Sequence, residues 1–134
     1  MAHAIDGYAG ACKNIHGHSY ELHVTVSGND ASGDDYIPAP GFILDFKELK
    51  KLMMRTVMDT FDHKLVLSRD YLSKKTDISS FENLVEWDVE PTAENLLIYI
   101  RKKLEKELPV TIKLNSLKIY ETKDSYAEWI NHHR

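Results

Sequence analysis

The chain contains a single cysteine, Cys12, and therefore cannot form an internal disulfide. One cysteine in 134 residues is typical of a protein of the reducing cytosol, so the cytoplasm is the expected location. Such a cysteine is either a small buried apolar side chain or a reactive thiol. The cysteine count alone leaves both interpretations of Cys12 open.

Long apolar runs and an excess of positive charge are also missing. No run approaches the roughly 20 residues of a membrane-spanning helix, and the N-terminal stretch MAHAIDGYAG lacks the basic and apolar regions of a secretory signal. The 17 Lys and Arg residues are outnumbered by 21 Asp and Glu residues, giving a net charge of -4 and a pI of about 5.9. We therefore expect neither a membrane nor a nucleic acid as partner.

The hydrophobic fraction of 43% in 134 residues is enough for one core, and the chain shows no internal repeat or linker. Residues 1–134 are therefore expected to form a single domain. Apolar and polar residues alternate from 16 to 27, which predicts a strand. Its inner face would carry His16, His18, Tyr20, Leu22, Val24 and Val26.

Two segments have helical spacing of apolar residues. The first is expected over 45–61, where Asp45 and Glu48 resemble a capping box. The second is expected from Thr92, a plausible N-cap, to Leu108, just before Pro109. No strand is predicted between the two helices along the sequence.

Strands are expected on both sides of the helices. The turn-forming residues 28–41 predict a hairpin connection to a short strand over 42–44, and a last strand over 115–122 is expected to pair with 126–130. Residues 68–90 are expected to be irregular. This order predicts an α+β fold with both helices on one face of an antiparallel sheet.

His16 and His18 are the first candidates for chemistry. Residues i and i+2 of a strand point to the same side, and a rise of roughly 3.3 Å per residue separates them by about 7 Å, so both rings can converge on one metal ion. A catalytic zinc takes three protein ligands and keeps one position open. Because the two rings share an apolar face, they need partners, and a metal ion would supply one.

The third ligand has two candidates. His3 could be folded back by the Gly-rich connection 7–17. His63 follows Asp62, and an Asp-His pair more often prepares an imidazole for proton transfer. Solvated positions are predicted for the other histidines, which are His23 on the opposite strand face and His132 and His133 in the tail.

Cys12 and Glu121 complete the set of candidates. A cysteine near a metal ion or a protonated histidine loses its proton more easily, so Cys12, four residues before His16, could act as base or nucleophile. It could also be a fourth zinc ligand, which would close the site and favour a structural role. Glu121 shares a strand face with apolar residues and would either bind a ligand with N–H donors or turn out to water.

Six motifs in order along the chain resemble the 6-pyruvoyl-tetrahydropterin synthase family. Within it, they are most similar to the bacterial branch that forms 6-carboxy-5,6,7,8-tetrahydropterin for queuosine biosynthesis. The motifs are Ala2-His3, CKNIHGHSY from Cys12, GFILDF from Gly41, FDHKL from Phe61, PTAEN from Pro91, and YET from Tyr120.

The resemblance implies a T-fold with a four-stranded antiparallel sheet and two helices on one face. Three subunits would join their sheets into a barrel, and two trimers would stack into a homohexamer with active sites between subunits. It also implies residue roles. These are zinc ligation by His3, His16 and His18, proton transfer by Cys12 with Asp62 and His63, anchoring of the pterin ring by Glu121, and positions near the ring for Thr92 and Glu94.

The implied reaction converts 7,8-dihydroneopterin triphosphate to 6-carboxy-5,6,7,8-tetrahydropterin, with release of acetaldehyde and triphosphate. The three residues between Cys12 and His16 match the bacterial branch, whereas the tetrahydrobiopterin branch usually has a longer gap. Lys13 stands where a folate-pathway branch uses glutamate. Three alternatives stay open: formation of the 6-pyruvoyl product, a non-catalytic zinc-stabilised binding module, and a ring-opening cyclohydrolase acting on a purine nucleotide.

Two departures from the family pattern affect what we expect of the site. Only Met1 and Ala2 precede His3, where the family usually has a full strand, so the hold on His3 is expected to be weaker. The segment 68–90 is longer than in compact bacterial members. It is expected to reshape the pocket mouth or the contacts between subunits.

Overall fold

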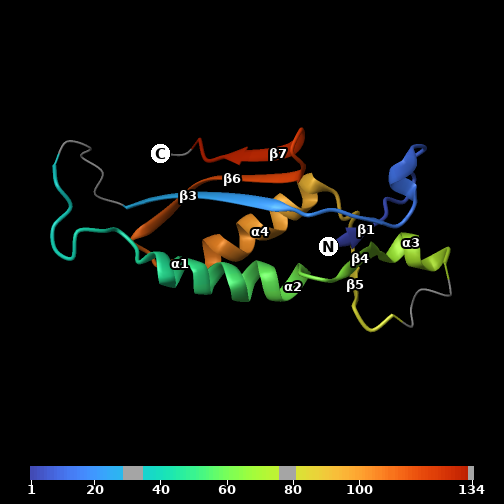
Figure 1. The fold of residues 1–134 in the computed structure, drawn as a ribbon, viewed down its shortest axis with the longest axis horizontal. Coiled ribbons are helices and arrows are strands. Elements are labelled where there is room, and N and C mark those ends of the chain that lie inside the picture. Colours follow the sequence, from blue (N-terminus) through green and yellow to red (C-terminus); the bar gives the residue numbers. More distant parts are fainter. Residues whose placement is uncertain (29–34, 76–80, 133–134) are drawn as a thin grey trace.

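The computed structural model describes residues 1–28, 35–75 and 81–132, and within them the strands form two sheets (Figure 1). An antiparallel sheet has the order β3-β6-β7 and contains β3 (Glu21–Gly28), β6 (Ile112–Thr122) and β7 (Ser125–Ile130). A mixed sheet has the order β2-β1-β4-β5 and contains β1 (Ala2–His3), β2 (His16–Gly17), β4 (Leu65–Ser68) and β5 (Leu84–Trp87).

The first long helical segment is continuous but changes its winding. It consists of α1 (Phe46–Met53), a π-helical turn η2 (Met54–Met58) and α2 (Asp59–Phe61). It begins where the sequence predicts, because the Asp45 carboxylate caps it by accepting a hydrogen bond from the N–H of Lys47. The predicted end near Phe61 is also confirmed.

The second long helix, α4 (Ala93–Glu107), begins after its predicted N-cap. The Thr92 hydroxyl accepts a hydrogen bond from the N–H of Asn95 at 3.2 Å. Two shorter helices are α3 (Arg69–Ser73) and the 3-10 turn η1 (Ala11–Lys13). Among the described residues, no helix is long and apolar enough to cross a bilayer.

The core lies between the β3-β6-β7 sheet and the two long helical segments, which cover the same face of that sheet (Figure 1). The prediction of an α+β fold with both helices on one face is therefore confirmed. The core centres on buried residues of α4 and β6, which include Leu96, Ile100, Leu104, Leu114, Leu117 and Ile119.

An irregularity in β6 explains why this strand is longer than predicted. Thr25 pairs with Ser116 but Val26 pairs with Leu114, so Asn115 is left over as a bulge. The bulge places Leu114 and Leu117 on the same buried face although they are three residues apart. A strict period of two loses this face at Asn115, which is why the sequence predicts a start at 115 instead of Ile112.

The predicted strand over 42–44 is wrong. Phe42, Ile43 and Leu44 lie outside regular structure, after Gly41, whose φ is +89°. Ile43 instead packs its side chain against the end of β3, because a Cβ built on Gly28 would lie 3.1 Å from its Cγ2. In the described residues the antiparallel sheet therefore has three strands, and the expectation of a four-stranded antiparallel sheet is corrected.

The predicted strand over 16–27 is divided between the two sheets. His16 pairs with His3 of β1, and the chain leaves this sheet after Gly17 and enters β3 only at Glu21. The predicted alternation of side chains is correct, but the pattern does not show that β2 pairs with β1 whereas β3 pairs with β6. The step at His18–Tyr20 connects the mixed sheet to the antiparallel one.

The segment 68–90 is more regular than predicted. Ser68 ends β4 and caps α3 by accepting a hydrogen bond from the N–H of Tyr71 at 3.0 Å. The strand β5 then pairs in parallel with β4. The middle of this segment, 76–80, lies outside the described residues, as do 29–34 of the predicted hairpin connection and His133 of the tail.

Candidate functional site

Three histidines converge where β1, β2 and the step after β2 meet. The ring centroids of His3, His16 and His18 lie between 4.6 and 5.2 Å apart. The ligand atoms of the three rings all lie within 4.8 Å of one another, which makes them a possible metal site. Strand pairing creates this arrangement, because His3 lies opposite His16 in the β1–β2 ladder and β1 is held on its other side by β4.

The backbone fixes two of the rings. His3 Nδ1 lies 2.6 Å from the carbonyl oxygen of Pro91, and His16 Nδ1 lies 2.7 Å from that of Asn14. A carbonyl oxygen can only accept, so both Nδ1 atoms carry the proton, and in the neutral rings both Nε2 atoms present a lone pair. Metal-binding histidines are usually oriented in this way.

The lone pairs of His3 and His16 point into the same space. Their Nε2 atoms lie 3.1 Å apart, which is unfavourable for two lone pairs unless a proton or a cation lies between them. Two nitrogens bound to one tetrahedral zinc at 2.0–2.1 Å would be separated by roughly 3.3 Å. The spacing of the two rings therefore fits a shared metal ion.

His18 supplies a third nitrogen without a partner. Its Nε2 is buried, makes no hydrogen bond, and lies 3.9 Å from the nearest carboxylate oxygen of Glu121. A buried unpaired nitrogen is costly, and a cation would satisfy it. Burial lowers the pKa of both His3 and His18, opposed at His3 by the hydrogen bond to Pro91 and at His18 by Glu121, which favours the neutral, metal-binding form.

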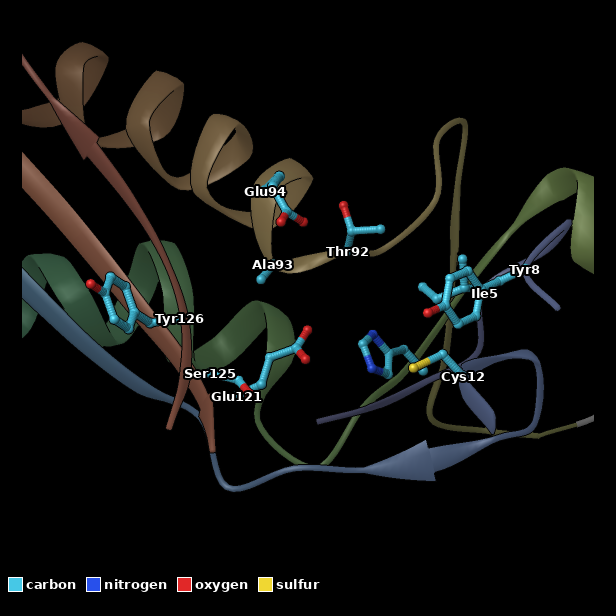
Figure 2. Close-up of a pocket in the computed structure, with 10 residues that line it drawn as sticks. Ile5, Tyr8, Cys12, Thr92, Ala93, Glu94, Glu121, Ser125 and Tyr126 are labelled. Carbon is cyan, nitrogen blue, oxygen red and sulfur yellow. The ribbon is translucent and has the colours of Figure 1, made fainter. Parts of the chain in front are cut away.

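A cavity of about 320 Å³ opens beside His3 (Figure 2). Cys12 reaches it from η1, Glu121 from the end of β6, and Thr92 and Glu94 from the start of α4. Its size lies at the lower end of the range of small-molecule sites. The structure thus brings five of the sequence-predicted residues to one cavity, next to the other two histidines.

Local hydrogen bonds hold the walls of this cavity together. The N–H of Ile5 donates to the carbonyl oxygen of Cys12 at 2.7 Å, which closes the loop that carries the thiol. The N–H of Asp6 donates to the Glu90 carboxylate at 2.6 Å, and this ties the same loop to the segment before α4. His3 is 2% exposed, so its side chain is buried although β1 has only two residues.

Asp62 and His63 are not part of this cavity. They line a second hollow of about 550 Å³, which His18 and Tyr20 also line. The two side chains pair at 3.1 Å, but that of His63 is 92% exposed. His63 also has a φ of +59°, which few non-glycine residues adopt, and its carbonyl oxygen accepts a hydrogen bond from the Asn83 amide.

Sequence reasoning missed three aromatic residues. The hydroxyl of Tyr20 lies 3.4 Å from both ring nitrogens of His3, and burial, followed by the nearby Glu121, raises its pKa. Tyr20 lies on the same side of the predicted strand as His16 and His18, and this pattern in the sequence could have identified it as a site residue. Tyr8 and Tyr126 line the cavity, and no local pattern marks them. His23 is exposed, as predicted.

Comparison with known proteins gives one consistent result. The model of the family described as 6-pyruvoyl tetrahydropterin synthase matches residues 1–131. A 6-carboxy-5,6,7,8-tetrahydropterin synthase from Rickettsia typhi is 28% identical over 94% of this chain and 90% of its own length. A 6-pyruvoyl tetrahydrobiopterin synthase from Homo sapiens is 35% identical over 84% of this chain and 66% of its own length.

A solved structure agrees with these relatives. The 6-pyruvoyl tetrahydropterin synthase of Caenorhabditis elegans superimposes with a TM-score of 0.64 and is 26% identical, covering 97% of this chain and 87% of that one. The similarity therefore extends over nearly the whole chain in both sequence and fold.

Proposed function

Because the chain belongs to the 6-pyruvoyl tetrahydropterin synthase family, whose architecture is the T-fold, we propose that it is a zinc-dependent lyase of pterin synthesis. Its substrate is 7,8-dihydroneopterin triphosphate, and its products are 6-carboxy-5,6,7,8-tetrahydropterin, acetaldehyde and triphosphate. Relatives that carry this name cover the chain almost completely, which supports the assignment. The product would be used in queuosine biosynthesis, in the cytoplasm.

The observation that carries this proposal is that a cluster of three histidines adjoins a cavity lined by other reactive side chains. The metal-binding set, His3, His16 and His18, adjoins a cavity that also contains a thiol and a carboxylate. A structural zinc site has no need of a cavity beside it, whereas a catalytic site needs an open position next to the substrate. The arrangement therefore supports an enzyme over a zinc-stabilised binding module.

His3, His16 and His18 would hold the zinc ion. When bound, zinc would supply a Lewis acid that polarises the oxygen atoms of the substrate side chain. The carbonyl oxygens of Pro91 and Asn14 keep two of the rings in the tautomer that offers Nε2. The histidines would thus be oriented before the metal arrives.

Cys12 and Glu121 would act on the two ends of the substrate. Glu121 accepts hydrogen bonds from the amino and ring N–H groups of the pterin, and a charged acceptor makes such bonds stronger. Cys12 is the base that removes and returns protons at the side chain. Thr92 and Glu94 contribute polar groups on the opposite wall of the cavity.

Asp62 and His63 would complete proton transfer from a neighbouring subunit. Within one chain they line a different hollow from Cys12, so the proposed relay with the thiol would use the Asp62–His63 pair of a second copy. This agrees with a homohexamer made of two stacked trimers, with active sites between subunits. The exposed imidazole of His63, paired with Asp62, would then contact the neighbouring subunit in the hexamer.

The decisive experiment is incubation of the zinc-loaded protein with 7,8-dihydroneopterin triphosphate and identification of the products by mass. We expect 6-carboxytetrahydropterin with stoichiometric acetaldehyde. A 6-pyruvoyl product without acetaldehyde would favour the alternative activity, which the 35% identity to the human enzyme keeps open. Formate from GTP would indicate a cyclohydrolase, and zinc binding without any turnover would indicate a binding module.

A further inference from the structure

Two exposed tyrosines line the cavity, and they differ in whether their rings contact other side chains. Tyr126 is already engaged, because Lys118 Nζ lies 3.9 Å from its ring centroid and Tyr120 lies 5.2 Å away. Tyr8 makes no hydrogen bond, ring contact or cation–π contact within residues 1–28, 35–75 and 81–132. Tyr8 is therefore the lining tyrosine whose ring has no such partner, and it lies on the wall that also carries Cys12 and Ile5 (Figure 2).

The loop around Tyr8 is built to keep its ring in this place. A Cβ built on Gly10 would lie only 2.7 Å from Cε1 of Tyr8, so the ring occupies space that any larger residue at position 10 would take. On the other side of the tyrosine, Gly7 has a φ of +76°, which few other residues adopt. The two glycines thus flank the tyrosine and let its ring lie close to the backbone beside the cavity.

Folding stability does not explain this arrangement. Tyr8 is 56% exposed, so its ring buries little apolar surface. An exposed aromatic ring at a cavity wall is, in contrast, well suited to stack on a flat ligand, because every planar heterocycle offers a π-face. Glu121 can satisfy the N–H edge of such a ring but contributes nothing to its face.

We propose that Tyr8 is a substrate-contacting residue, on whose ring the pterin ring stacks while Glu121 binds its N–H edge. The inference rests on the proposed function and extends it to how the ring is held. It makes Tyr8 a determinant of affinity and of preference for planar bicyclic ligands. It gives Tyr8 no part in proton transfer, so its effect falls on binding and not on the chemical step.

The test measures the dissociation constant of neopterin, which lacks the triphosphate, by its fluorescence, together with KM and kcat for the triphosphate substrate. Tyr8→Ala is expected to raise the dissociation constant and KM about tenfold, the size typical of one lost stacking contact, with kcat within about twofold. Tyr8→Phe keeps the ring and should bind like the parent protein.

Gly10→Ala is the sharpest variant. The backbone at Gly10, with φ of -91°, accepts alanine, but the added methyl group displaces the Tyr8 ring. It should weaken neopterin binding although the tyrosine is still present. Tyr36→Ala removes an even more exposed tyrosine that does not line the cavity, and should change nothing.

Three outcomes would overturn the stacking role of Tyr8. Unchanged binding in Tyr8→Ala, with turnover intact in the parent protein, removes the stacking role and leaves the proposed function standing. A changed oligomer mass in Tyr8→Ala with unchanged binding makes Tyr8 a contact between copies. If the parent protein itself neither binds neopterin nor turns over, the proposed function fails and the inference fails with it.

Discussion

His3 Nε2 and His16 Nε2 lie 3.1 Å apart, although the two residues are 13 positions apart in the chain. Each ring is turned by a hydrogen bond from its Nδ1 to a backbone carbonyl oxygen. The backbone therefore forces two nitrogen lone pairs towards each other, which is stable only with a cation or a proton between them. This pair is the structural basis of the metal predictions that follow.

Removing one of the proposed ligands should lower the amount of bound zinc. His16→Ala is expected to reduce bound zinc from about one per chain to well below half after dialysis, because two remaining ligands bind zinc too weakly. Metal analysis by plasma mass spectrometry measures this. His23→Ala, an exposed histidine next to Glu21 at 3.4 Å, is the matched control and should keep full zinc. Full zinc in His16→Ala would contradict the assignment.

The sequence predicts local features of this fold well, because they depend on neighbours in the chain. The caps at Asp45 and Thr92 and the alternation in β3 are of this kind. It fails where pairing is decided by distant segments. Residues 42–44 are apolar enough for a strand but find no partner, and β5 pairs with β4 although the segment 68–90, which contains β5, looks irregular.

The candidate site shows the same division. That His16 and His18 point to the same side follows from the alternation of side chains along an extended chain. The orientation of His3 depends instead on the carbonyl oxygen of Pro91, 88 residues away. The wall that contains Tyr8 and Tyr126 is likewise assembled from segments distant in sequence. No local pattern encodes such contacts, so residue type alone could not single out these tyrosines.

Replacing the thiol should stop the chemistry and leave the binding intact. Cys12→Ala is expected to lower kcat by about 10²–10⁴-fold, the usual contribution of a general base, while zinc content and neopterin affinity stay near those of the parent. Steady-state kinetics and metal analysis together check this. Loss of zinc in the variant would instead make Cys12 a fourth ligand and the site a structural one.

Removing the charge of Glu121, the proposed anchor of the pterin ring, should weaken substrate binding. Glu121→Gln keeps the shape of the side chain but loses charged hydrogen bonds worth about 1.5–3 kcal/mol each. We expect KM and the neopterin dissociation constant to rise at least tenfold with zinc retained. Glu128→Gln removes a carboxylate from the exposed face of β7 and is the control. Equal affinities in the two variants would exclude Glu121 as the anchor.

The metal-free protein should lose stability in mild acid. Burial lowers the folded-state pKa of His18 below the ordinary value of about 6.5, so the unfolded chain takes up a proton more readily at this position. The contribution of neutral His18 to folding stability is therefore present above about pH 6.5 and is lost as the pH falls from there towards the lowered value. Thermal unfolding of chelator-treated protein between pH 7.5 and 5.5 should show a falling Tm. In His18→Gln, which cannot take up this proton, the fall should be smaller, and an equal fall in both proteins would show that another group causes it.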